Sequence, residues 1–182
     1  MSSKRVYVDT ISSQDKLRRL VWRICFLSLF YPTPNSGFNR WRIFLLRIFG
    51  ASIGKNCKVS STSRIWAPWN LSMKDWVCLA ELSEIYNVDV VYLENHATVS
   101  QRATLCSASH RIDSLSRPLI TSPIRLEAHS WVCAEAFIGP GVNVGEGSVV
   151  GARAVVFKDV NSWDVVVGNP AQVIRKRAIE AE

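Results

Sequence analysis

Aliphatic residues recur at every sixth position over most of the chain after residue 52. The first run contains Ile53, Val59, Ile65, Leu71 and Val77. The second contains Ile85, Val91, Ala97 and Ala103, and the third contains Leu126, Val132, Ile138, Val144, Val150 and Val156. A small residue often follows the aliphatic one. A period of six fits neither the 3.6-residue period of an α-helix nor the two-residue alternation of a simple strand.

A six-residue period is typical of a chain that makes one short strand and one bend per hexad, so that three hexads complete a triangular coil. The aliphatic residue then points into the prism, and the next residue is small because the corner is crowded. Coils stack by parallel strand pairing, so each buries its aliphatic side chains only against its neighbours. A β-sandwich would instead show a period of about 10 residues. The pattern predicts a mainly β solenoid, a parallel β-helix.

Two segments ahead of the repeat have a helical period. Residues 16–31 and 38–49 carry apolar side chains at helical spacing, and a segment with two prolines, residues 31–37, separates them. The open end of a solenoid exposes unpaired strand edges, which terminal helices commonly cover. We therefore expect these helices to cap the β-helix.

The six-residue register breaks between Thr104 and Arg125. A solenoid that tolerates such an excursion usually carries it on one face as a functional loop. The predicted organisation is thus a helical cap over residues 1–50, a β-helix domain over 51–157 with an inserted loop at about 104–125, and a C-terminal strand and tail over 158–182.

The charge of the chain is concentrated at one end. Of 22 Lys and Arg and 15 Asp and Glu, which give a net charge of +7, residues 1–50 hold nine basic and two acidic ones, so the rest of the chain holds 13 of each. This distribution argues against a nucleic-acid-binding protein, whose basic residues would spread over the main domain. Basic amphipathic helices also suit an anionic membrane surface, which is compatible with the cap.

Several other classes of protein are disfavoured. The most apolar stretch, residues 20–31, contains Arg23 and is shorter than the ~20 residues that a bilayer crossing needs. The five cysteines are odd in number and form no C-x-x-C pair, so we expect reduced thiols. We therefore expect a cytoplasmic protein, and any contact with the inner face of the membrane would be peripheral. The three histidines, at 96, 110 and 129, are too scattered for a zinc site, and no metal is expected.

Parts of the sequence resemble the hexapeptide-repeat acyltransferases. The resemblance covers about residues 40–177 and is carried by residues from Ile53-Gly54 onward, by Ile138 to Gly145 and by Val167 to Ile174. Within that group, the sequence is most similar to the WcaF-type acetyltransferases of colanic acid biosynthesis, on residues 39–55, 66–71 and 100–110. The resemblance implies a left-handed β-helix, a homotrimer, and direct transfer from acetyl-CoA to a sugar of an exopolysaccharide precursor.

His110 is the candidate catalytic residue, because the resemblance places the catalytic histidine in the stretch Ser107 to His110. Acetylation of a hydroxyl requires removal of its proton, and histidine, with an ordinary pKa of about 6.5, is the usual general base. A carboxylate or a carbonyl should hold the other ring nitrogen, and the candidates are Asp113 and Glu135. A covalent route through Cys106 is disfavoured, since Cys106 is in phase with the wall strands and the family transfers directly.

Acyl-CoA lies along the last coils, between two subunits, in the family that the sequence resembles. This ligand is long and anionic, so it needs a groove, backbone donors and cations. Carried over position by position, the resemblance implies a thioester end near Trp131 and Ala134, a pantetheine arm beside Gly151 and Ala152, and phosphates near Lys158 and Arg175.

The acceptor site is less defined by the sequence. An aromatic-rich face of Trp66, Trp69 and Trp76 could stack on a pyranose ring, and Asn87 and Asp113 are candidate substrate-binding residues. The acceptor is expected to be a sugar or a lipid-linked oligosaccharide. Two alternatives stay open: N-acetylation of another small acceptor, and a non-catalytic β-helix scaffold that joins a membrane-bound assembly through the basic helices.

Overall fold

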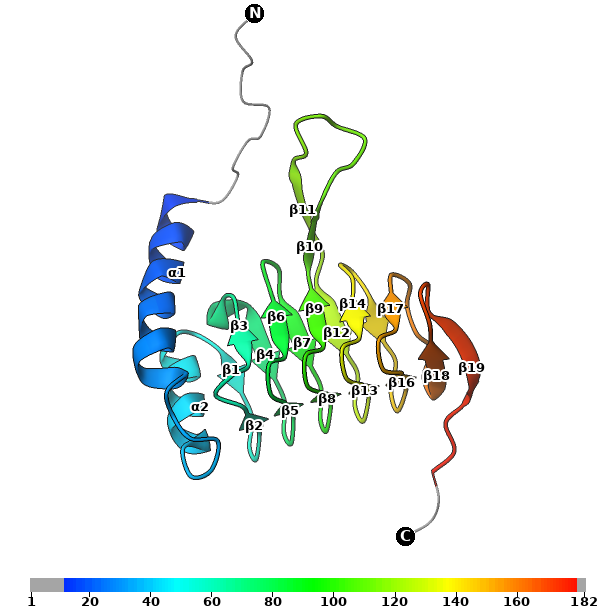
Figure 1. Ribbon diagram of the computed structural model, residues 1–182, viewed down its shortest axis with the longest axis horizontal. Coiled ribbons are helices and arrows are strands. Elements are labelled where there is room, and N and C mark those ends of the chain that lie inside the picture. Colours follow the sequence, from blue (N-terminus) through cyan, green and yellow to red (C-terminus); the bar gives the residue numbers. More distant parts are fainter. Residues whose placement is uncertain (1–11, 180–182) are drawn as a thin grey trace, which may run out of the picture.

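The computed structural model describes residues 12–179. Lys4, Arg5 and Asp9 of the basic segment and residues 180–182 lie outside the described residues. Figure 1 shows helices at one end, a body of short stacked strands, and a hairpin that projects from one edge of the body.

The body is a parallel β-helix, as the hexads predict. Its first coil consists of β1 (Ser52–Ile53), β2 (Lys58–Val59) and β3 (Arg64–Ile65). The second consists of β4 (Leu71–Met73), β5 (Cys78–Leu79) and β6 (Glu84–Tyr86), and the third of β7 (Val91–Leu93), β8 (Thr98–Val99) and β9 (Thr104–Cys106). The fourth consists of β12 (Ile124–Leu126), β13 (Trp131–Val132) and β14 (Phe137–Ile138), and the fifth of β15 (Asn143–Val144), β16 (Val149–Val150) and β17 (Val155–Val156).

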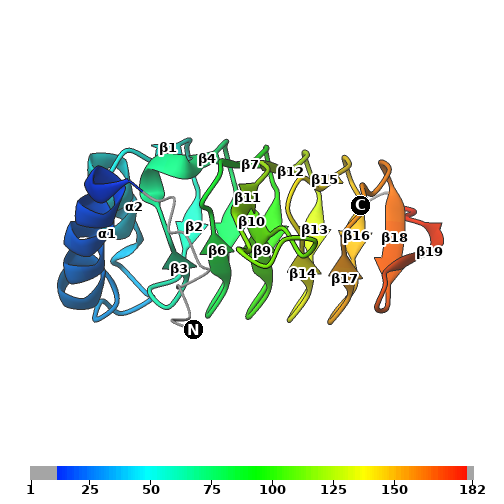
Figure 2. The same cartoon turned by 90° about the horizontal axis from the view of Figure 1, so that it is seen from above.

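The strands form three parallel sheets, one for each face of the prism (Figure 2). Sheet A has the order β1-β4-β7-β12-β15, and sheet C has the order β17-β14-β9-β6-β3. Sheet B has the order β2-β5-β8-β13-β16-β18-β19. In it, β18 (Asp164–Val167) belongs to a sixth coil that starts with a parallel bridge from Val160 to Val144, and β19 (Gln172–Lys176) returns antiparallel to β18. The parallel coils therefore continue past residue 157.

All the aliphatic positions of the three sequence runs are buried, as predicted, but their register needs one correction. Each hexad buries two side chains that are two residues apart, and Ile65 occupies the second of these positions. Eight residues, not six, separate Ile65 from Met73 and Ile85 from Leu93. The predicted leads Leu71, Val77, Val91, Ala97 and Ala103 therefore occupy the first inward position of their hexads.

The extra residues all fall on one edge of the prism. The edges between sheets A and B and between B and C, here called AB and BC, turn tightly through residues with positive φ, such as His96 (φ 61°) and Glu135 (φ 62°). The edge between sheets C and A, called CA, carries the short helix η2 (Pro68–Asn70), residues 87–90 and the excursion 107–123. That excursion forms a hairpin of β10 (Ala108–His110) and β11 (Leu119–Thr121).

The small residues that follow the buried aliphatic ones are required by close packing between coils. A Cβ on Gly145 would lie 2.5 Å from the backbone nitrogen of Ser162, and a Cβ on Gly151 would lie 2.6 Å from Cγ1 of Val167. Both distances are far shorter than a normal contact, because the next coil passes directly against the bend. The sequence interpretation of these glycines as crowded corners is confirmed.

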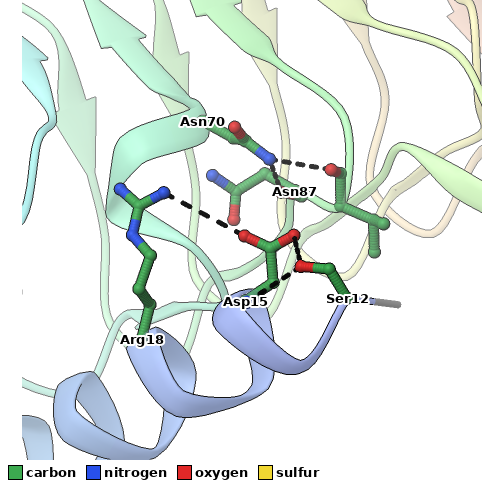
Figure 3. A network of polar contacts seen from close by, with 6 residues as sticks. Ser12, Asp15, Arg18, Asn70 and Asn87 are labelled. Atoms are coloured by element: carbon green, nitrogen blue, oxygen red, sulfur yellow. Dashed lines mark hydrogen bonds and ion pairs between the residues drawn. The ribbon is translucent and has the colours of Figure 1, made fainter.

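The N-terminal segment folds as α1 (Ser13–Cys25), a π-helical turn η1 (Phe26–Phe30) and α2 (Asn39–Ile48). Helix α1 begins three residues before the predicted start because Ser12 caps it, its hydroxyl accepting a hydrogen bond from the backbone N–H of Asp15 at 3.0 Å (Figure 3). No helix within residues 12–179 has the length and apolarity that a bilayer crossing requires.

The helices cap the first coil by occupying the free hydrogen-bonding groups of its edge strands. The Trp22 indole N–H donates to the Ile65 carbonyl at 2.7 Å. The Asn39 amide pairs with the Cys57 carbonyl and the Val59 N–H, and Arg42 Nε donates to the Val59 carbonyl at 2.8 Å. These contacts remove the donors and acceptors through which an open edge would pair with another chain.

Candidate active site

His110 lies at the end of β10, where the hairpin leaves the CA edge, and its side chain is exposed. Its Nδ1 lies 2.7 Å from the backbone carbonyl oxygen of Arg117, on the returning limb of the hairpin. A carbonyl only accepts hydrogen bonds, so Nδ1 carries the hydrogen in this contact. The neutral ring then has its lone pair on Nε2, which is the atom able to take a proton.

The carbonyl of Arg117 points at His110 because of the local turn. Arg117 has a positive φ of 44°, and its N–H donates to the Ser114 carbonyl at 3.0 Å, while the Arg111 N–H donates to Pro118. The positioning group is therefore a main-chain atom, which the types of side chain in the sequence do not reveal.

Neither carboxylate proposed as the partner of His110 has that role. Glu135 lies on the BC edge, where its two oxygens bind Arg102 and Arg153, each at 2.6 Å. Hydrogen bonds from Arg153 and Arg102 hold the pKa of Glu135 below its ordinary value. Asp113 is exposed in the hairpin loop, and the imidazole nitrogen is already held by the Arg117 carbonyl.

Most of the residues expected at the acyl-CoA site lie on one side of the prism. Trp131 and Arg175 share a row across sheet B, in which Trp131 pairs with Val149, Val149 with Val165, and Val165 with Arg175. Ala134, Gly151 and Ala152 follow on the adjoining BC edge, where Ala152 is exposed. Lys158 does not join them, because it follows β17 on the CA edge.

Within one chain, His110 lies far from the residues expected to bind acyl-CoA. His110 leaves from the CA edge, whereas Ala134 and Ala152 lie on the BC edge, so the full width of sheet C stands between them in one chain. At the tip of the hairpin, Ile112 and Leu115 are 91% and 90% exposed, which is unusual for apolar side chains.

Asn87 is structural, contrary to its expected role in substrate binding. It is fully buried, its Oδ1 accepts from the Ala67 N–H at 3.0 Å, and its Nδ2 donates to the Ala67 carbonyl at 2.7 Å. Asn70 in turn binds the carbonyls of Asn87 and Val88, next to the start of α1 (Figure 3). These bonds fix the extra residues of the CA edge and leave the Asn87 amide no access to an acceptor.

The three tryptophans of the expected aromatic face do not share a face. Trp66 and Trp69 lie on the CA edge, where Arg19 stacks over Trp66 at 4.3 Å and Arg18 over Trp69 at 4.2 Å. Trp76 lies on the AB edge and stacks on His96, which stacks on His129 with 4.7 Å between ring centroids. Extra residues after Ile65 shift the phase between Trp66 and Trp76, and the sequence spacing alone does not show this.

The described residues, 12–179, contain no group of three or more metal-ligating side chains. His96 and His129 form part of a ring stack along the AB edge, far around the prism from the hairpin. Cys106 points its thiol at the Ala108 carbonyl at 3.1 Å, within the wall of the coil.

The sequence was compared with known proteins, and no family profile matches it. One curated relative is the WcaF protein of Escherichia coli K12, whose name describes an acetyltransferase of colanic acid biosynthesis. The two sequences are 39% identical over 143 residues, which cover 79% of this chain and 78% of the relative. The chain belongs to the WcaF-type acetyltransferase family. The family that the hexads and the Val167 to Ile174 ending indicated is thus confirmed.

Solved structures of low sequence identity share the fold of this acetyltransferase. A hexapeptide-repeat acetyltransferase of Vibrio cholerae, solved with acetyl-CoA, has a TM-score of 0.81 and 22% identity, and the match covers 93% of this chain and 92% of that one. A maltose O-acetyltransferase of Clostridium difficile has a TM-score of 0.79 and 23% identity, with 92% and 90% covered. The fold is the left-handed parallel β-helix, as the family resemblance implied.

Proposed function

We propose that this acetyltransferase transfers the acetyl group of acetyl-CoA to a hydroxyl of an exopolysaccharide sugar, with His110 as the general base. The contact between His110 Nδ1 and the Arg117 carbonyl, 2.7 Å long, carries the proposal, because it leaves Nε2 as the proton acceptor. The test is acetyl-CoA turnover against a panel of free sugars and lipid-linked oligosaccharides, with mass spectrometry locating the new acetyl group as O-linked or N-linked.

The proposed reaction needs one base and no covalent enzyme intermediate. Nε2 takes the hydroxyl proton while the sugar oxygen attacks the thioester carbonyl carbon. The tetrahedral intermediate then collapses, the C–S bond breaks, and the imidazolium returns the proton to the CoA sulfur. The Arg117 carbonyl stabilises the imidazolium that forms between these steps, since its dipole faces the protonated Nδ1.

The residues proposed to hold acetyl-CoA have a suitable chemistry. Gly151 is half-buried, the neighbouring Ala152 is small and exposed, and Trp131 on the adjoining sheet B is 44% exposed. Arg175 would meet a phosphate at the C-terminal end of the row. Lys158 lies on the CA edge, so Lys158 and Arg175 of one chain would contact two different CoA molecules.

We propose that a second copy of the chain completes each site, in a homotrimer. Two observations support this: sheet C separates His110 from Ala152 within one chain, and Ile112 and Leu115 at the hairpin tip lie almost entirely in solvent. In a ring of three copies, the hairpin of one subunit would lie beside the BC edge of the next.

A subunit-mixing experiment tests this arrangement. Chains with His110→Ala lack the base, and chains with Ala152→Trp have a blocked pantetheine groove, so each homotrimer is expected to be inactive. Co-expression with two different tags and purification through both yields mixed trimers, in which one of the three interfaces joins an intact hairpin to an intact groove. We expect about a third of the wild-type activity in these trimers. Mixed trimers as inactive as the two parents would contradict a shared site.

A peripheral membrane contact through α1 is supported by the outer face of that helix. Leu17, Val21 and Ile24 lie at helical spacing and are 61%, 49% and 60% exposed, and Arg18 and Arg23 lie beside them. Apolar side chains flanked by basic ones suit the surface of an anionic bilayer. We expect the protein to co-sediment with vesicles that contain phosphatidylglycerol.

Replacement of Leu17, Val21 and Ile24 by serine should abolish this co-sedimentation, because the variant keeps the basic residues but loses the inserted apolar surface. The matched control replaces Val173 and Ile174, which are 56% and 57% exposed at the opposite end, and should still bind. Equal binding by both variants would exclude α1 as the contact. Vesicle binding without any acetyl-CoA binding would favour the scaffold alternative.

A further inference from the structure

A groove lies between α1 and the outer side of sheet C. Its volume is about 690 Å³, and it is lined on one side by α1 and η1 and on the other by β3 and β6. Figure 1 shows that α1 and the β10/β11 hairpin extend beyond the prism on the same side. The strands of its wall belong to the same sheet as β9, the strand that precedes the hairpin.

The charge of the groove favours an anion. Its lining includes four cationic side chains and one carboxylate, namely Lys16, Arg19, Arg23, Arg64 and Glu84. Several apolar side chains of α1 and η1 complete the wall, and of the four cations only Arg19 is half-buried, while the other three are exposed. An excess of three positive charges in such a groove attracts a group with more than one negative charge.

One of these cations has an unused donor. The Arg19 Nε atom is buried and has no hydrogen-bond acceptor among the described residues, while its guanidinium stacks over the Trp66 ring at 4.3 Å. Buried polar groups are normally paired, and the few exceptions call for an explanation such as an absent ligand. The stacking fixes the plane of the guanidinium, whose fork of donors matches the oxygens of a phosphate.

One residue of the groove wall is hydrogen-bonded to the segment that leads into the hairpin of His110. Tyr86 lines the groove, and its ring lies 4.8 Å from that of Trp66, which gives a pair of aromatic surfaces beside Arg19. The Tyr86 carbonyl accepts a hydrogen bond from the Ser107 N–H at 3.0 Å. Ser107 is three residues before His110, and three residues of extended strand cover about 10 Å.

We propose that this groove is an acceptor subsite for a glycosyl diphosphate: Arg19 and Arg64 bind the diphosphate, and the sugar extends along Trp66 and Tyr86 toward His110. The sugar part rests on the proposed acetyltransferase activity, whereas the diphosphate part rests on the groove alone. Nucleotide-activated sugars and lipid-carrier-linked sugars both contain this diphosphate, so both are candidate sources.

Calorimetry with inorganic pyrophosphate tests the anion site without relying on catalysis. The wild-type protein should bind pyrophosphate, and Arg19→Met should weaken binding about 10- to 100-fold, since it removes charge-assisted hydrogen bonds. Arg18→Met is the matched control: Arg18 is the adjacent residue and stacks in the same way over Trp69, but it does not line the groove. Arg64→Met, on the strand side, provides a second variant that leaves α1 intact. Pyrophosphate binding that is absent, or equal in all four proteins, would overturn the proposal.

Steady-state kinetics test whether the groove binds the acceptor, and whether the diphosphate belongs to a nucleotide-activated or a lipid-linked sugar. Arg19→Met should raise KM for a glycosyl diphosphate about 10- to 100-fold, and leave kcat and the KM values for acetyl-CoA and for the free sugar unchanged. A nucleoside diphosphate sugar, a polyprenyl diphosphate sugar and the free sugar are compared as acceptors. The proposal is supported if either diphosphate has a lower KM than the free sugar. A free sugar that matches both would overturn it. A protein that binds pyrophosphate but acetylates nothing would instead refute the proposed function.

Discussion

Replacement of His110 by alanine is expected to lower kcat by a factor of about 10²–10⁴, because the sugar hydroxyl then loses its proton without a positioned base. The KM for acetyl-CoA should stay nearly unchanged, since none of the residues proposed to bind CoA lies in the hairpin. The measurement is steady-state release of CoA thiol with a saturating sugar acceptor, together with calorimetric binding of acetyl-CoA.

The matched control for this variant is His96→Ala. His96 is also exposed and also lies at a bend, but on the AB edge in a stack between Trp76 and His129. Its loss should leave kcat within a factor of about two, because distant surface substitutions usually have small effects. A His110→Ala enzyme with wild-type kcat would refute the proposed mechanism.

Replacement of Arg42 by methionine is expected to lower the free energy of unfolding by about 3 kcal/mol. Arg42 is 1% exposed and donates to the Val59, Pro34 and Asn35 carbonyls and to the Thr33 hydroxyl, at 2.8 to 3.0 Å. Methionine fills much of the same volume but donates to none of them, so the buried Val59 carbonyl and three partly buried acceptors lose their donor, at about 1 kcal/mol each. Burial lowers the pKa of Arg42, yet a guanidinium stays charged at neutral pH.

Urea unfolding followed by circular dichroism measures this effect, and Arg40→Met on the same helix provides the control. Arg40 is exposed, so its replacement should change the free energy of unfolding by less than about 0.5 kcal/mol. Equal stability of the Arg42→Met and Arg40→Met proteins would mean that the Arg42 contacts with the linker and β2 contribute nothing to folding.

The sequence predicts the architecture well because the β-helix is a local repeat. One aliphatic residue per six, followed by a small one, indicates the stacked coils, and the close approach of Gly145 to Ser162 shows why the small residue is needed. The same pattern predicts the register poorly on the CA edge. Two extra residues after Ile65 and two after Ile85 leave the inward positions aliphatic, so Leu71 and Val91 look like continuations of the earlier phase.

The candidate site is predicted less well than the architecture, because its contacts join residues that are distant in the sequence. His110 is visible from its motif, but its partner is the Arg117 main-chain carbonyl, which exists only after the hairpin has closed. Asn87 looks like a free amide in the sequence, whereas it pairs with Ala67 one coil away. Arg42 is one of the nine basic residues of the N-terminal segment, and it lies buried between the linker and β2. In each case the deciding contact is between residues that the sequence does not show as neighbours.

The regular stacking of strands in sheet C sets the distance between the proposed acceptor subsite and His110. The groove lies on β3 and β6, and the hairpin follows β9. The distance between the proposed diphosphate site and His110 is therefore set by the number of sheet C strands between them. Neighbouring strands are about 4.8 Å apart, and a coil can be gained or lost only as a unit. Relatives that accept longer or shorter glycosyl chains would therefore differ from this protein in increments of one coil.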